Sequence, residues 1–425
     1  MRNIERVIGR RVWDSRGRPT VEAEIVLDGG ARGRAIAPAG ASMGSGEAKD
    51  LRDGGPSLGG LDVQQAVSHV NGEINSALSG IDVTDQTAID RRLLELDGTS
   101  QMARLGGNAT IAVSMASLHA AAAASNLPLY AMLANGGDVS LPLPEIQIFG
   151  GGAHAGRRVD VQDFLVACPS AKSFAEALNR TGEVYQAAGR LMHERNLVHG
   201  VADEGGWWPA FQTNEEVLEF LMRAIEAAGF SPGQDVHIAL DVAASEFGRD
   251  GRYRLGLENR ELDSDGLGEL LLAWIGRYPI VSIEDPFAED DAAGFSRFTA
   301  EVGKRVQVVG DDLLVTNADR VRRAAGDRLV NCVLIKPNQA GTISQTKAAF
   351  DAARRAGIAS IISARSGESE DVTIAHLAVG WNAGQIKVGS MSRGERTAKW
   401  NELLRLEEAL AGRASFVGWG AFSFQ

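Results

Sequence analysis

The chain has 425 residues, of which 44% are hydrophobic and 23% charged, and it carries a net charge of −12. Because a single core stops growing at about 250–300 residues, this length predicts two globular domains. The acidic balance, without a clustered basic surface, argues against nucleic acid or an anionic membrane as partner. No apolar run reaches the roughly 20 residues that span a bilayer. The only cysteines, Cys168 and Cys332, indicate buried thiols and a cytoplasmic location.

Residues 1–135 are predicted to form an α+β domain in which strands precede helices. The run Thr20–Leu27 predicts a strand, residues 28–30 (Asp-Gly-Gly) a hairpin turn, and residues 31–37 the returning strand. Three helical patterns follow, at Gln64–Leu78, Thr84–Leu96 and Asn108–Asn126. The Ala-rich composition of the third pattern indicates a buried helix.

A small, Gly-rich segment, Pro38–Gly46, separates these strands from the helices. Its composition suits a plain linker and an active-site lid about equally, because glycines permit hinge dihedrals. We take Gly40, Ala41 and Ser42 as the candidate lid residues.

From residue 140 to 425 the pattern changes to short strands alternating with amphipathic helices, which is typical of parallel β/α architecture. Capping boxes at Ser173 and Thr213 are predicted to start two of the helices. Apolar runs predict strands at Val236–Leu240, Ile280–Ile283, Val306–Val309, Cys332–Ile335, Ser360–Ile362 and Gln385–Ile386. So many βα units favour a barrel, with a doubly wound open sheet as second choice.

Charged residues stand at the ends of five of these runs, namely Asp241, Glu284, Asp311 (after Gly310), Lys336 and Lys387. Side chains at the carboxyl ends of barrel strands point into the mouth where such enzymes place their sites. The three carboxylates suit a hard divalent cation, and Mg²⁺ is favoured because it leaves positions for water and substrate. The rival interpretation is a salt-bridged cluster, which the desolvation cost of five buried charges makes rare.

The same residues indicate a reaction class. Lys336 is the candidate base, since nearby cations lower an ammonium pKa. Glu204, in a Gly-flanked loop, is the candidate acid, so that one group removes a proton from carbon while the other protonates a leaving hydroxyl. Arg365 and Ser366 offer donors suited to a phosphate, so a small anionic phosphorylated substrate is expected.

Five segments match the motifs of one family in order and spacing: Val12–Glu22, Ser282–Asp291, Lys336–Gln339, Arg365–Asp371 and Gly384–Lys387. Through them nearly the whole chain resembles enolase. The resemblance implies an α/β fold, a modified (β/α)8 TIM-type barrel preceded by an α+β capping domain, and a homodimer or higher homo-oligomer. It implies these site roles: Asp241, Glu284 and Asp311 bind Mg²⁺, Lys336 is the base, Glu204 assists hydroxide departure, Lys387 binds the substrate carboxylate, Arg365 and Ser366 bind its phosphate, and His154 and Gln162 line the pocket.

Several positions depart from the family pattern. The lid serine that helps to bind a second, substrate-borne Mg²⁺ is Ala39, the lid threonine is Met43 and the lid histidine is Gly46. The glutamate after Gln162 is the shorter Asp163, and the histidine before Arg365 is Ala364. These changes keep the first metal site, the base and the acid, but remove polar groups from the lid and the phosphate side.

Three functions follow as alternatives. The altered pocket favours a specialised paralogue similar to the carboxyphosphonoenolpyruvate synthase branch of the family, which serves phosphonate and phosphinate natural-product biosynthesis. Such an enzyme would act on 2-phosphoglycerate or a close analogue to give an enolpyruvate product. The second alternative is a conventional enolase that converts 2-phosphoglycerate to phosphoenolpyruvate. The third is a non-catalytic scaffold that has kept the fold.

Overall fold

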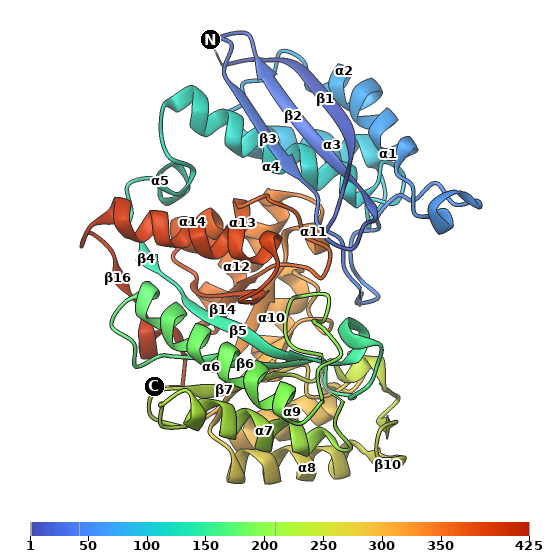
Figure 1. Cartoon of the computed structure of the whole chain (residues 1–425). Helices are drawn as coiled ribbons and strands as arrows, with labels where there is room; N and C mark the ends of the chain where they lie inside the picture. The colour runs from blue at the N-terminus through green and yellow to red at the C-terminus, as the bar shows by residue number, and fades with distance from the viewer. Residues whose placement is uncertain (1, 42, 209, 425) are drawn as a thin grey trace.

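The computed structural model describes residues 2–41, 43–208 and 210–424. An antiparallel three-stranded sheet and its helices lie above a closed barrel, as Figure 1 shows with the N-terminal region in blue and teal. The α/β fold, a modified β/α barrel preceded by an α+β domain, is thus as predicted. Ser42, one of the three candidate lid residues, lies outside the described residues.

The N-terminal sheet has the order β1-β2-β3, with β1 at Ile4–Trp13, β2 at Pro19–Leu27 and β3 at Arg32–Ile36. The predicted strands β2 and β3 are confirmed. Strand β1 was not predicted, because arginines and glutamates interrupt its apolar pattern. Those charges lie across from partners on β2, where Arg10 pairs with Glu22 and Glu24.

The three predicted N-terminal helices are confirmed. The first consists of α1 (Gln64–His69) and α2 (Asn75–Leu78), joined without a break by a π-helical turn. The others are α3 (Gln86–Asp97) and α4 (Gly107–Ser125). Helix α4 packs on β2 and β3 on one side and on helices of the barrel domain on the other. Apolar residues therefore surround it, as expected of a helix covered on all sides. A short helix, α5 (Leu129–Ala134), completes the domain.

The barrel closes in the order β11-β12-β13-β14-β15-β5-β6-β7. Its strands are β5 (Leu143–Gly150), β6 (Asp163–Ala167), β7 (His237–Asp241), β11 (Ile280–Glu284), β12 (Gln307–Gly310), β13 (Cys332–Ile335), β14 (Ala359–Ser363) and β15 (Gly384–Ser390). Closure rules out the open doubly wound sheet. The six predicted barrel strands are confirmed, and both cysteines are buried thiols.

Strand β6 is antiparallel to both of its neighbours, whereas the other barrel pairs are parallel. Its amino-terminal residue, Asp163, therefore lies in register with Asp241 at the carboxyl end of β7. This reversal brings Gln162 and Asp163 to the same mouth as the charged residues that follow the parallel strands.

Helices surround the barrel: α6 (Phe174–Glu194), α7 (Asn214–Ala227), α8 (Ser264–Arg277), α9 (Ala292–Val302), α10 (Ala318–Gly326), α11 (Pro337–Ala340), α12 (Ile343–Ala356), α13 (Thr373–Gly380) and α14 (Gly394–Leu410). A small ribbon follows β7, formed by β8 (Gly248–Arg249), β9 (Arg252–Leu255) and β10 (Arg260–Asp263). The two-residue strands β4 (Ser140–Leu141) and β16 (Ser415–Phe416) pair with each other. Within the described ranges, no helix combines the length and apolarity that a membrane crossing requires.

The predicted capping boxes are half confirmed. Ser173 and Thr213 cap α6 and α7 by accepting the backbone N–H of Glu176 and Glu216. The motif also predicts that each glutamate side chain accepts the backbone N–H of the capping residue, and this second bond does not form. They accept instead from the residue before it, Lys172 N at 2.9 Å and Gln212 N at 2.8 Å.

Candidate active site

One buried cavity at the carboxyl ends of the parallel strands gathers most of the predicted site. Its lining includes His154, Gln162, Asp163, Glu204, Asp241, Lys336, Arg365, Ser366 and Lys387, together with Ala364. Glu284 and Asp311 are not in this lining, but both are buried and pair with its lysines. Residues that are more than 200 positions apart in the sequence therefore meet at a single place, because the strand ends that carry them converge at one mouth of the barrel.

Lys387, on β15, is the centre of a buried cluster of acids. Its Nζ lies 2.9 Å from Asp241 Oδ2, 2.7 Å from Glu284 Oε2 and 3.4 Å from Asp163 Oδ2. Burial and then Asp241 raise the pKa of Glu284 well above its usual range, although Lys387 opposes them. Burial lowers the pKa of Lys387, but the surrounding acids, Asp241 first, raise it well above normal.

The third predicted metal carboxylate, Asp311, faces Lys336. Its Oδ2 pairs with Lys336 Nζ, while its Oδ1 accepts from Gln339 Nε2 at 2.8 Å. The neighbouring Asp285 holds this turn in place, because its carboxylate accepts the backbone N–H groups of Asp311 and Asp312 at 2.9 and 2.8 Å. Asp285 was not singled out from the sequence, although it lies next to Glu284.

Among the side chains alone, burial, Arg365 and Lys387 lower the pKa of Lys336, but Asp311 and Glu284 outweigh them and raise it above its usual value. The predicted lowering depends on a bound Mg²⁺ and stays a prediction. Because Asp311 is also a candidate metal ligand, the same carboxylate links the charge state of the base to the predicted metal site.

Two groups of described residues have ligand atoms that all lie within 4.8 Å of one another: His154 with Asp163 and Glu204, and Asp285 with Asp311 and Asp312. The predicted set of Asp241, Glu284 and Asp311 is divided instead between Lys387 and Lys336. Its donors nevertheless fit a hard cation, since all are carboxylate oxygens. One of them, Glu284 Oε1, is buried without a hydrogen-bond partner among the described residues. A divalent ion would satisfy that oxygen.

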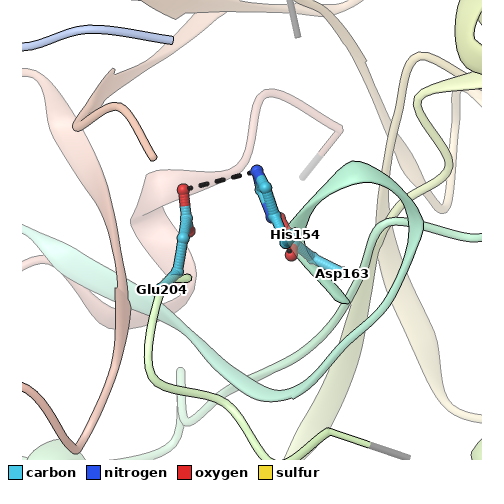
Figure 2. A group of neighbouring side chains, drawn as sticks. All are labelled: His154, Asp163 and Glu204. Atoms are coloured by element: carbon cyan, nitrogen blue, oxygen red, sulfur yellow. Dashed lines mark hydrogen bonds and ion pairs between the residues drawn. The ribbon is translucent and has the colours of Figure 1, made fainter. Parts of the chain in front are cut away.

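His154, Asp163 and Glu204 also line the cavity. Figure 2 shows His154 facing Glu204, with Asp163 beside it. His154 Nδ1 lies 3.1 Å from Asp163 Oδ1, and its Nε2 lies 3.8 Å from Glu204 Oε1 and 2.9 Å from Ser366 Oγ. Burial lowers the pKa of His154, but Asp163 and Glu204 raise it above its usual value. Burial opposes ionisation of Asp163, yet His154 and Lys387 lower the pKa of that carboxyl.

The lid segment contacts the loop that carries Arg365 and Ser366. Ala39 and Gly367 exchange two backbone hydrogen bonds of 2.8 Å, and Ala41 N donates to Ser366 Oγ at 3.3 Å. Gly40 is held through its carbonyl, which accepts from Arg16. Residues 39–41 therefore lie against the predicted phosphate side, and their role as a lid stays a prediction.

Glu47, just after the lid, was not predicted to take part in the site. It pairs with both terminal nitrogens of Arg365, at 2.8 and 3.3 Å, and accepts from Gly44 N and Gln339 Nε2. Asn338 Oδ1 also accepts from Arg365. The guanidinium predicted to bind phosphate is thus tied to the lid. The sequence separation of 318 residues leaves no local signal for this ion pair.

Arg396, on α14, is a second residue that the sequence did not indicate. It is fully buried, and its guanidinium donates to the main-chain carbonyls of Arg365, Ser366 and Val388. The buried Arg396 guanidinium therefore holds the backbone of Arg365 and Ser366, the two residues predicted to bind phosphate. We interpret Arg396 as a positioning residue, since its guanidinium bonds main-chain carbonyls of residues that line the cavity.

We expect Arg396→Met to weaken substrate binding more than turnover. Three buried carbonyls would lose their donors, at about 1–3 kcal/mol each, and the loop carrying Arg365 would relax. KM for the phosphorylated substrate should rise about tenfold or more, corresponding to 1.4 kcal/mol, with a smaller change in kcat. Arg405→Met, an exposed arginine on the same helix, is the matched control. Equal losses in kcat and kcat/KM would contradict a positioning role.

The fold and the charged barrel mouth place this chain among two-domain β/α-barrel proteins with an N-terminal capping domain. Two family models match it: the enolase N-terminal domain over residues 4–133, and the enolase C-terminal TIM barrel domain over residues 138–424. Together they span nearly the whole chain, and the chain belongs to the enolase family.

Proposed function

We propose that the protein is a Mg²⁺-dependent enzyme that removes a proton next to the carboxylate of 2-phosphoglycerate or a close analogue and gives an enolpyruvate product. The observation that carries this proposal is the shared cavity, in which a lysine base and a carboxylic acid are found with two cationic binding groups. A non-catalytic scaffold would have no reason to bury these charges together at the cost of desolvation.

In this mechanism Lys336 accepts the proton from carbon as a neutral amine, and Glu204 donates a proton to the hydroxyl that leaves as water. Lys387 binds the substrate carboxylate, and Arg365 and Ser366 bind its phosphate. His154 hydrogen-bonds Ser366 and faces Glu204, so it lies between the group that binds the phosphate and the group that protonates the hydroxyl. Gln162 and Asp163 complete the wall.

Asp241, Glu284 and Asp311 are the residues that would hold Mg²⁺. When bound, the ion supplies Lewis-acid stabilisation of the negative charge that develops on the substrate carboxylate. Ala39 removes a hydroxyl from the lid, so a second, substrate-borne Mg²⁺ would depend on the phosphate and on water for its remaining ligands.

Within the family we favour a specialised paralogue similar to carboxyphosphonoenolpyruvate synthase, with conventional enolase as the alternative. The supporting observation is that Ala364 and Asp163 both line the cavity. Asp163 is also committed to His154 and Gln147, so its carboxylate is not free to replace a longer glutamate. A pocket with fewer polar groups on the phosphate side suits a phosphonate-bearing or second substrate.

The experiment is a turnover assay with 2-phosphoglycerate and Mg²⁺, following phosphoenolpyruvate, alongside deuterium exchange at the substrate's α-carbon. A median enzyme turns over at about 10 s⁻¹, and losing one positioned polar contact costs about 10²–10³-fold. We therefore expect dehydration below about 0.1 s⁻¹ with exchange retained. Dehydration at ordinary rates would identify a conventional enolase, and the absence of exchange and of Mg²⁺ binding would favour the scaffold.

We also propose that the domain division lies between residues 135 and 140 and that the chain forms a homodimer or a larger homo-oligomer, which the family resemblance supports. We propose a cytoplasmic location, which the two buried thiols support. Light scattering of the purified protein tests the assembly, and a monomer would contradict it.

A further inference from the structure

One buried acid near the site has no part in the proposed mechanism. Glu145 lies on β5 and is only 2% exposed. Its register partner on the adjacent strand β15 is Lys387. Residues two apart on a strand face the same side, and Gln147, two residues further along β5, hydrogen-bonds Asp163 at the mouth of the barrel. The Glu145 side chain must therefore point into the interior of the barrel, beneath the active-site cavity.

The polar residues around Glu145 are satisfied, but Glu145 is not. Gln307 donates to Ser282 Oγ at 3.1 Å and to Gln385 Oε1 at 3.0 Å, and Gln385 donates to the carbonyl of Ala421 at 3.0 Å. Glu145 Oε1, by contrast, is buried without a partner among the described residues. An unpartnered buried carboxylate oxygen costs free energy. Barrel packing alone would favour an apolar residue here.

The charges around Lys387 suggest a role for the carboxylate of Glu145. The closest partners of Lys387 are Asp241 and Glu284, which are also proposed to hold Mg²⁺. An ammonium and a divalent cation would compete for the same carboxylates and repel each other. Before substrate brings its own carboxylate to Lys387, acids that are not metal ligands would have to balance the ammonium. Asp163, whose Oδ2 lies 3.4 Å from Lys387 Nζ, and Glu145, the register partner of Lys387, are placed to do so.

We propose that Glu145 is a positioning residue that supplies the counter-charge for Lys387 when Asp241 and Glu284 hold the cation. This inference rests on the proposed Mg²⁺ site. Burial raises the pKa of Glu145 to about 7, Lys387 lowers it, and Asp241 raises it. Burial and then Glu145 raise the pKa of the Cys332 thiol.

The test is isothermal titration of the full-length, metal-free protein with Mg²⁺ alone, comparing wild type with Glu145→Gln. Partners outside the direct ligands of a metal typically contribute 10–100-fold in affinity, so the Kd for Mg²⁺ should rise about tenfold. The melting temperature of the metal-free protein should stay the same or rise, because the amide removes an unpaired buried acid. A merely structural glutamate would lower the melting temperature and leave the Kd unchanged.

Two further variants sharpen the comparison. Gln385→Met removes a polar group from the same layer without changing charge and should keep the wild-type Kd. Glu145→Asp should weaken Mg²⁺ binding by a smaller factor than Glu145→Gln, and it decides the question if Glu145→Gln does not fold. A wild-type Kd in both Glu145 variants would overturn the inference. Failure of the wild-type protein to bind Mg²⁺ would instead overturn the proposed function.

Discussion

Lys336→Met should reduce kcat by roughly 10²–10⁴-fold, the range for a positioned general base, while leaving Mg²⁺ binding intact. Methionine keeps the length of the side chain but has no group that can accept a proton from carbon. The substitution also removes the ammonium from Asp311, so this carboxylate becomes more available to a cation. Mg²⁺ affinity should therefore be equal to or higher than that of the wild type.

Deuterium exchange isolates the step that Lys336 performs. Wild-type protein in D₂O should exchange the α-proton of the substrate, and Lys336→Met should not. The control is Lys172→Met, the same substitution at an exposed lysine before α6, which should behave as wild type. Normal exchange in Lys336→Met would show that another group is the base and would contradict the assignment of Lys336.

The sequence located this site because its parts are encoded locally. Asp241, Glu284, Asp311, Lys336 and Lys387 each follow a short apolar strand. In a closed barrel the strand ends must converge. Recognising each strand from its own sequence was therefore enough to predict that these charged residues lie together. The structure adds which charges pair, with Lys387 taking Asp241 and Glu284, and Lys336 taking Asp311.

The two unpredicted barrel strands were missed for different reasons. Strand β5 contains Pro144, Glu145 and Gln147 because its inner face carries polar residues of the site and of the barrel interior. In β5, functional placement overrides the apolar pattern by which a strand is recognised. Strand β6 is apolar after Asp163, but only a 3-10 turn, Gly152–Ala155, lies between it and β5, and it runs antiparallel to its neighbours, which breaks the expected βα alternation.

Long-range partners could not be predicted for a different reason. Arg396 is identified as functional only by its bonds to the carbonyls of Arg365 and Ser366, and Glu47 only by its pair with Arg365. Every residue has a main-chain carbonyl, so a hydrogen bond to one leaves no pattern in the sequence. Each of these contacts also depends on how two separate elements pack. These residues therefore become visible only once the fold is known.

Glu284→Gln should abolish detectable Mg²⁺ binding and turnover, with a loss in affinity beyond the 10–100-fold of residues that only support a ligand. The metal-free protein should lose little stability, because Lys387 retains Asp241 and Asp163 as partners and because burial already disfavours the charged form of Glu284. These two expectations separate a metal ligand from a structural ion pair, whose loss would destabilise the protein with or without Mg²⁺.

Thermal unfolding with and without Mg²⁺ measures this difference. A ligand that binds only the folded state stabilises it by about 2.7 kcal/mol at a concentration 100 times its Kd, so the wild-type melting temperature should rise when Mg²⁺ is added. The melting temperature of Glu284→Gln should not respond, whereas Glu269→Gln, at an exposed position on α8, should respond as the wild type does. A full response in Glu284→Gln would mean that the ion binds elsewhere, for instance at Asp285, Asp311 and Asp312, whose carboxylate oxygens already lie within 4.8 Å of one another.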